Sequence, residues 1–154
     1  MSTPSSRESS RFSNRSGDEV GSASVELALL VPALVLMLGL LVGGGRLWFA
    51  RTTVSEAAYS AARAASLSRT AGQASSEGAA AARLSLSTSG LTCLDQAVSV
   101  DTGAFAVPVG QPATVTTRVT CSVPFADVLL PGMPGSIRLH STGSSALDTY
   151  RSRR

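Results

Sequence analysis

The sequence predicts an α+β protein. A long N-terminal transmembrane helix continues into an alanine-rich soluble helix, and a small antiparallel β-sheet domain follows. Three observations indicate this: an uncharged run from Leu27 to Gly45, an alanine-rich stretch with three- and four-residue spacing after it, and a two-residue alternation beyond Gly90. A length of 154 residues excludes a large multidomain enzyme. With 44% hydrophobic and 15% charged residues, the chain is too apolar to be disordered throughout.

Residues 1–21 are predicted to form a disordered leader. The stretch is rich in Ser and Arg and carries almost no apolar side chains. It therefore cannot bury enough surface to offset the conformational entropy that folding would cost.

Residues 22–46 are predicted to form a transmembrane helix, because their uncharged core approaches the ~20 residues that a helix needs to cross ~30 Å of hydrocarbon. A cleavable secretory signal peptide is the alternative. The leader carries Arg7, Arg11 and Arg15, and small residues for cleavage occur at Val42-Gly43-Gly44. The apolar region is longer than the roughly 7–15 residues usual in signal peptides, and its helical pattern continues beyond it, which favours the membrane helix.

Two details of this segment also suit a membrane helix. Pro32 lies about one turn into the apolar run, where a missing N–H costs least, and it predicts a mild kink. Arg46, Trp48 and Arg51 follow the glycines and form a belt of the kind that anchors a helix at the membrane–water interface.

Residues 47–89 are predicted to be an alanine-rich helical segment. No Pro or Gly interrupts the stretch to about Leu67, so the helix is expected to continue from Ser24 to Leu67, about 66 Å at 1.5 Å per residue. A loop containing Gly72 and Gly78 should follow, and then a short second helix over Glu77–Ser87. The small face of the first helix could pack on a partner helix or on the chain's own sheet; it comprises Ala57, Ala58, Ala61 and Ala65.

Residues 90–154 are predicted to form the small β-domain. The clearest strand runs from Ala113 to Val123, and shorter ones surround Ala97–Val100 and Ile137–His140. Cys121 lies on the apolar side of the main strand and Cys93 precedes another, so a disulfide is expected if the compartment is oxidising. Two buried free thiols are the alternative. A disulfide would place this domain outside the cell and the leader in the cytoplasm.

The sequence shows no set of catalytic residues. His140, the single histidine, alternates with apolar neighbours on the polar face of its strand, which indicates a solvent-exposed side chain. Neither a phosphate-binding glycine loop nor a metal-ligand spacing occurs. The 13 basic residues are all arginines and are scattered along the chain. We therefore expect no enzymatic activity, no cofactor, no metal site and no nucleic-acid partner.

Glu26 is the most informative residue, because an ionisable group at the head of an apolar run is costly if it enters hydrocarbon and should have a partner or a purpose. It follows Gly21 in the string Gly21-Ser-Ala-Ser-Val-Glu26. This register resembles the processing site of type IV prepilins, in which a glycine precedes the cut and a glutamate is the fifth residue after it. The whole segment from Gly21 to Ser66 resembles the TadE-like family of pseudopilins from tight-adherence (Flp-type) pilus systems.

The resemblance implies cleavage between Gly21 and Ser22 by a prepilin peptidase, and no catalytic role for the chain itself. It further implies a protein of the bacterial cytoplasmic membrane that assists pilus assembly or enters the filament. The implied partners are the lipid bilayer, other pilins or pseudopilins and the pilus assembly platform.

The residues themselves suggest how the helix would assemble. Glu26 could pair with the free amine of Ser22 on a neighbouring chain. Gly39 and Gly43 form a G-x-x-x-G step that permits close helix approach. The alternative function is a generic single-pass anchor that displays a small extracytoplasmic binding domain, with Glu26 incidental and the leader retained.

Overall fold

The computed structural model describes residues 19–128 and 132–150. In chain order the elements are α1 (Glu19–Leu67), α2 (Ala71–Thr88), β1 (Asp95–Asp101), the 3-10 helix η1 (Gly103–Ala106), β2 (Thr114–Pro124), α3 (Phe125–Val128) and β3 (Ser136–Ala146). The chain divides into two compact units, Met1–Gly39 and Leu40–Arg154, and α1 contributes to both. The predicted α+β class is confirmed, with a long apolar N-terminal helix, a further helix and an antiparallel sheet.

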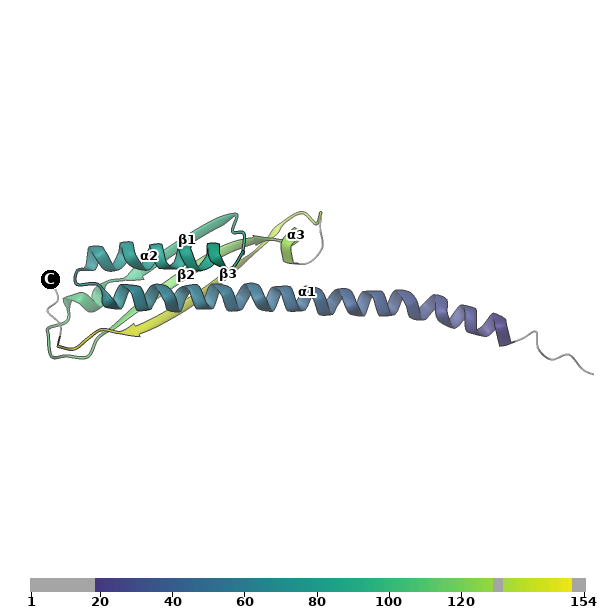
Figure 1. Ribbon diagram of the computed structural model, residues 1–154, viewed down its shortest axis with the longest axis horizontal. Coiled ribbons are helices and arrows are strands. Elements are labelled where there is room, and N and C mark those ends of the chain that lie inside the picture. Colours follow the sequence, from purple (N-terminus) through teal and green to yellow (C-terminus); the bar gives the residue numbers. More distant parts are fainter. Residues whose placement is uncertain (1–18, 129–131, 151–154) are drawn as a thin grey trace, which may run out of the picture. The chain divides into compact units, whose positions relative to one another are not determined.

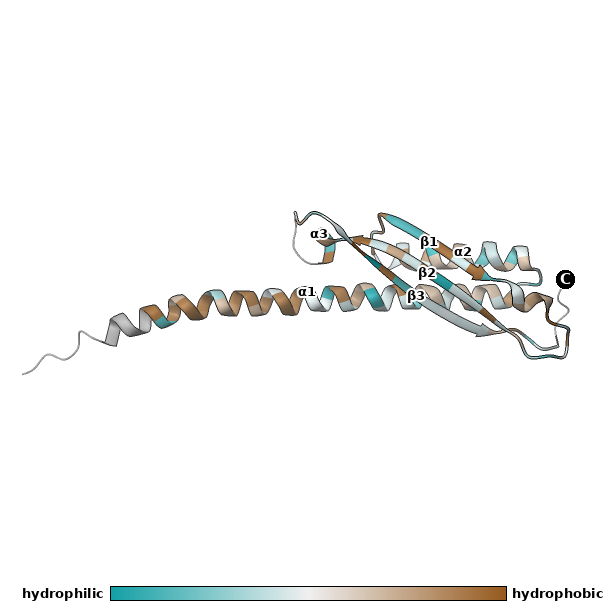
Figure 2. Cartoon of the chain, turned by 180° about the vertical axis from the view of Figure 1, so that it is seen from behind, coloured by the Kyte–Doolittle hydropathy of each residue, from teal (hydrophilic) through white to brown (hydrophobic). Residues whose placement is uncertain are grey.

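Helix α1 changes character along its length. In Figure 2, the coloured ribbon of α1 is mainly brown (hydrophobic) along its first part and paler and mixed along its second. The helix ends at Leu67, as predicted, and Pro32 lies inside it. It begins at Glu19, earlier than the expected Ser24, so the last three residues of the predicted leader are helical. The remainder of that leader, residues 1–18, lies outside the described residues.

The sheet is antiparallel with the order β1-β2-β3. In the register, Val119 lies opposite Val98 of β1 and Ser141 of β3. Along β2 the buried side chains alternate with exposed ones from Thr114 to Val119, because successive residues of a strand point to opposite faces. The period of two found in the sequence therefore corresponds to one covered face and one open face.

The second part of α1 lies along the covered face of the sheet (Figure 1). The α1 residues with at most 1% exposure are Ala50, Val54, Ala57, Ala58, Ala61, Ala62 and Ala65. Of the two packing alternatives, the structure therefore selects the chain's own sheet for the alanine face. Thr117, the polar exception on the apolar side of β2, is fully buried and donates a 2.6 Å hydrogen bond from Oγ1 to the Ala58 carbonyl. Near the C-terminal end of α1, the Ser66 hydroxyl forms a hydrogen bond with the Ser145 hydroxyl of β3, and the two oxygens are 2.9 Å apart.

Helix α2 is longer than predicted, and the expected loop containing Gly72 and Gly78 is wrong. It begins at Ala71, because the Thr70 hydroxyl accepts a 3.2 Å hydrogen bond from the Gln73 amide and caps the first turn. Gly78 is buried where a Cβ would meet Val100 of β1 and the Ala61 carbonyl of α1. Gly78 does not interrupt the helix; its missing side chain allows α2 to approach α1 and β1 closely.

The disulfide joins Cys93, just before β1, to Cys121 of β2. Its Cα atoms are 5.4 Å apart and 28 positions separate the two residues. The Leu94 amide donates to the Ser122 carbonyl at 2.8 Å, so the backbone is paired directly beside the bridge. The bridge therefore fixes the entry into the sheet after α2.

We predict that Gly143→Ala destabilises unit 2 by about 1–3 kcal/mol, because a Cβ at this position would collide with the Ala58 carbonyl and the Tyr59 amide of α1. Urea unfolding of the full chain in detergent micelles measures the change. Gly72→Ala is the matched control. It lies on α2 with open space around its missing Cβ, and it should stabilise by about 0.5–1 kcal/mol. Equal effects of the two substitutions would contradict the proposed close contact.

We predict that Cys93→Ser with Cys121→Ser lowers the unfolding free energy by about 3–4 kcal/mol, since the bridge closes a 28-residue loop in the unfolded chain. The same urea titration measures it, with wild-type protein under reducing conditions as a second comparison. A loss below about 1 kcal/mol in both samples would show that the bridge does not constrain the unfolded state as expected.

Candidate functional site

The first part of α1 exposes apolar side chains on all sides. Its large apolar residues between Val25 and Val42 have exposures of 51–77%. Within the described part of the chain, one helical stretch, Val25–Leu67, is long and apolar enough to cross a membrane, and its membrane-like window is 0% buried. Exposure of such a large apolar surface to water is energetically unfavourable, whereas lipid or other apolar helices can cover it. This single apolar helix indicates a single-pass membrane protein.

Glu26 is the only charged residue from Val25 to Gly45. Its side chain is exposed. An unpaired carboxylate at this position is tolerated at the headgroup level but is costly deeper in the bilayer. The single chain therefore leaves Glu26 available to a group supplied from outside.

Gly21 and Ser22 lie in the first turn of α1, two and three residues after its start at Glu19. Ser22 precedes Glu26 by four residues, so the two positions lie on the same side of the helix, about 6 Å apart along its axis. The predicted processing bond and the predicted recognition residue are thus aligned on one face.

Gly39 and Gly43 differ in their surroundings, although they are four residues apart on one helix. Gly39 is exposed and has nothing within 4 Å of the position where a Cβ would be, whereas Gly43 is buried. Gly39 is therefore open to close approach by another helix. The role predicted for the pair in helix packing remains a prediction.

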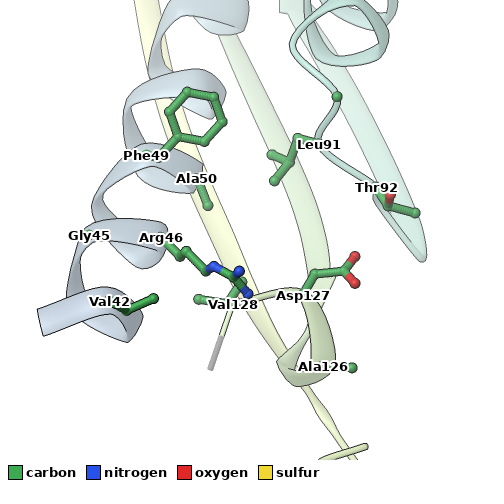
Figure 3. A pocket seen from close by; sticks show the side chains of 11 residues that line it. Val42, Gly45, Arg46, Phe49, Ala50, Leu91, Thr92, Ala126, Asp127 and Val128 are labelled. Carbon is green, nitrogen blue, oxygen red and sulfur yellow. The ribbon is translucent and has the colours of Figure 1, made fainter. Parts of the chain in front are cut away.

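A groove of about 700 Å³ lies in unit 2 where α1 leaves the apolar run (Figure 3). Its walls come from α1, from the segment after α2 and from α3. They are lined by Val42, Gly45, Arg46, Phe49, Ala50, Gly90, Leu91, Thr92, Ala126, Asp127 and Val128. In Figure 3, Arg46 extends from α1 toward Val128, while the Asp127 carboxylate points away from it. Trp48 lies in the chain between the lining residues Arg46 and Phe49, and its side chain is 71% exposed.

The groove places α3 beside the end of the uncharged run. The run ends at Gly45 and Arg46 is the first charge after it, so this level of α1 is where a membrane helix meets the headgroups. Because Val42 and Arg46 line the same groove as Val128, α3 is held at that level of the helix. This end of unit 2 therefore consists of the start of its part of α1, the turn at Gly90 and α3.

The remaining candidate residues lie apart from this region. His140 is exposed on β3, as its alternation predicted. Among the described residues, no group of three His, Cys, Asp or Glu side chains could hold a metal ion.

Analysis of the sequence missed the groove, although it identified Arg46 and Trp48. Leu91 and Asp127 carry no local motif, and only the tertiary structure brings them to α1. The residues Phe125-Ala-Asp-Val128 directly after β2 offered a sequence signal, because the large apolar side chains of Phe125 and Val128 favour contact with another element over full exposure.

In a comparison with protein families, residues 21–63 match the model of a family described as TadE-like protein. No curated protein and no solved structure matches the chain. The matched segment contains Gly21, Ser22, Glu26, Gly39 and Gly43. It covers the apolar run and the first part of the alanine-rich continuation of α1.

We predict that Leu36→Arg reduces membrane integration of the chain, because a charge at this lipid-exposed position costs about 2.5–3.5 kcal/mol near the bilayer centre. Leu84→Arg is the matched control, since Leu84 is an equally large and similarly exposed leucine on α2, outside the apolar run. Extraction of membranes with alkaline carbonate measures the partition. Release of neither variant, or of both alike, would contradict a bilayer-spanning α1.

Proposed function

We propose that the chain is a membrane protein associated with the tight-adherence (Tad) pilus and that it acts as a pseudopilin in assembly of that pilus, because residues 21–63 match the TadE-like family model. The observation that supports this most is the apolar surface exposed around α1 from Val25 to Val42. A precursor in the bilayer covers this surface with lipid, and an assembled bundle of parallel helices covers it with neighbouring subunits. The apolar surface of α1 is therefore compatible with both the precursor in the bilayer and the assembled helix bundle.

The proposed processing step is hydrolysis of the peptide bond between Gly21 and Ser22 by a prepilin peptidase. It removes the leader with its three arginines and leaves a free α-amine on Ser22. The cut lies within the first turn of α1, so the mature helix begins at its new terminus. This end then carries both the amine charge and the unsatisfied amides of a helix N-terminus.

Glu26 is proposed to recognise the amine of a neighbouring subunit. A neighbour shifted by about 6 Å along the helix axis, the rise of four residues, brings its Ser22 amine level with Glu26. In a medium of low dielectric constant, such a pair favours this register strongly over registers that leave either charge unpaired. The pair would thus fix the axial step between subunits.

The disulfide supports an orientation in which unit 2 is extracytoplasmic, since disulfides persist in oxidising compartments. The leader and the processing bond would then lie on the cytoplasmic side. The protein itself takes part as a structural subunit without catalytic activity.

The decisive experiment measures the intact mass and the N-terminal sequence of the protein extracted from membranes of its native host. A mature chain that begins at Ser22 supports the proposal. An intact leader supports a plain membrane anchor, and a start near Gly44 indicates a signal peptide.

We predict that Glu26→Ala leaves membrane insertion and cleavage intact but reduces the number of pili, because the neighbour's amine loses its partner. Glu56→Ala is the matched control, as Glu56 is an exposed glutamate on α1 beyond the apolar run. Electron microscopy of cells that carry each variant measures pilus number. Normal piliation with Glu26→Ala would refute the recognition role.

A further inference from the structure

The sheet of unit 2 has two outer edges, which belong to β1 and β3 (Figure 2). Among the residues that the structure describes, each of these strands pairs with β2 alone. Both run antiparallel to β2, so β1 and β3 point in the same direction. The free edge of such a strand presents backbone N–H and C=O groups that can pair with a strand of another chain.

The outward backbone groups of β3 belong to its even-numbered residues. Just after the strand, the Leu147 amide donates to the Ala113 carbonyl at 2.8 Å, and these two positions continue the register of β3 on β2. Hydrogen-bonded and non-hydrogen-bonded pairs alternate along an antiparallel ladder, so the odd-numbered residues of β3 bond to β2 and the even-numbered ones turn their groups outward. The even-numbered residues within the strand include Arg138, His140, Thr142 and Ser144.

A second groove of unit 2, with a volume of about 420 Å³, lies along this edge. It is lined by Arg51 and Val54 of α1 and by four consecutive residues of β3, Arg138, Leu139, His140 and Ser141. Successive side chains of a strand point to opposite faces, and Leu139 is buried while its two neighbours are exposed. A groove that all four residues line therefore lies at the edge of β3 and leaves that edge open. We call it the edge groove.

The two edges carry opposite charges on the open face of the sheet. Arg138 and His140 of β3 are exposed on this face, and so is Asp95 of β1. The register places Asp95, Ser122 and Arg138 in one row across the sheet. Pairing of two β3 edges would bring basic side chains together, and pairing of two β1 edges would bring Asp95 near Asp101. Only the pairing of β3 with β1 brings opposite charges side by side.

We propose that β3 of one copy pairs in parallel with β1 of a second copy of this chain, so that the sheet continues from one subunit to the next. Copies inserted in one membrane in the same orientation present these two strands in parallel. A copy displaced sideways without an axial shift places its Asp95 beside Arg138, and a shift of two residues, about 6.6 Å, places it beside His140. The inference rests on the common orientation that the proposed function assumes, but not on the cut after Gly21.

The proposed contact joins two different edges, so it is heterologous. Each pair of copies keeps one free β1 and one free β3, and further copies can add without closing a ring. Strand β1 has only seven residues, so the contact is short. Neighbouring parallel helices in the membrane raise the effective concentration of the two edges and so favour their pairing.

The test places the photoreactive amino acid benzoylphenylalanine at position 142 of the full chain and irradiates membranes of the native host. A ladder of cross-linked oligomers is expected, with the new bond mapped by mass spectrometry to residues 95–101 of a second copy. The same label at position 116 is the matched control, because Thr116, like Thr142, is exposed on the open face but belongs to the central strand. Equal capture from the two positions, or no capture from position 142, would overturn the proposal.

An exchange of charges between two differently tagged copies tests which edges meet. Arg138→Asp in the labelled copy should lower the cross-link yield about 3- to 10-fold, because it sets two carboxylates side by side. Asp95→Arg in the other copy should restore the yield. Both side chains are exposed, so urea unfolding should show little change in stability for either variant. A yield that is not restored between two folded variants would contradict the pairing of these edges.

The site of capture distinguishes the other possible partners. A bond to residues 136–146 of a second copy would indicate a two-fold contact between like strands, and a bond to a different protein would assign the edge to that protein; either result would overturn the proposal. A mature chain that begins at Ser22 but gives no cross-link would overturn the edge pairing alone. A cross-link in a chain with an intact leader would support the edge pairing and refute the processing step.

Discussion

The structure of unit 2 depends on the close packing of the α1 alanine face against β2 and β3. Ala58 lies at its centre, where its carbonyl accepts the buried Thr117 hydrogen bond and closely approaches Gly143. Alanine loses no side-chain rotamer freedom when it is buried, and it allows backbones to approach each other. Larger side chains on α1, or a side chain at position 143, would separate the helix from the sheet and open both grooves.

This packing also explains how one helix serves two environments. Before Gly45, α1 carries large apolar side chains that are exposed all round; after it, small side chains are buried on one face and charged ones lie outside. The change occurs at Arg46, Trp48 and Arg51. Because the same helix forms the core of unit 2, the anchor residues are held rigidly against α3 and β3.

In the proposed assembly, Glu26 and the amine of a neighbour set an axial step between helices. Helix α1 continues to Leu67, so one element carries both the residues of that step and the small buried face of unit 2.

The sequence alone determined the class of the fold, the extent of the apolar run, the end of α1 at Leu67 and the alternation of β2, because these follow from local periodicity and composition. Gly21, Ser22 and Glu26 were likewise readable as a linear motif. The sequence failed at Gly78, where a glycine that usually interrupts helices serves a contact between α1, α2 and β1.

Only the tertiary structure decided which surface the alanines cover and which residues meet in the grooves. Arg51 and Arg138 are 87 positions apart, and no periodicity along one segment can relate them. Both residues line one groove because of the register of β3 on β2 and the close approach of β3 to α1 at Gly143. Local patterns determine the elements and their faces, whereas the pairing of faces depends on packing between distant segments.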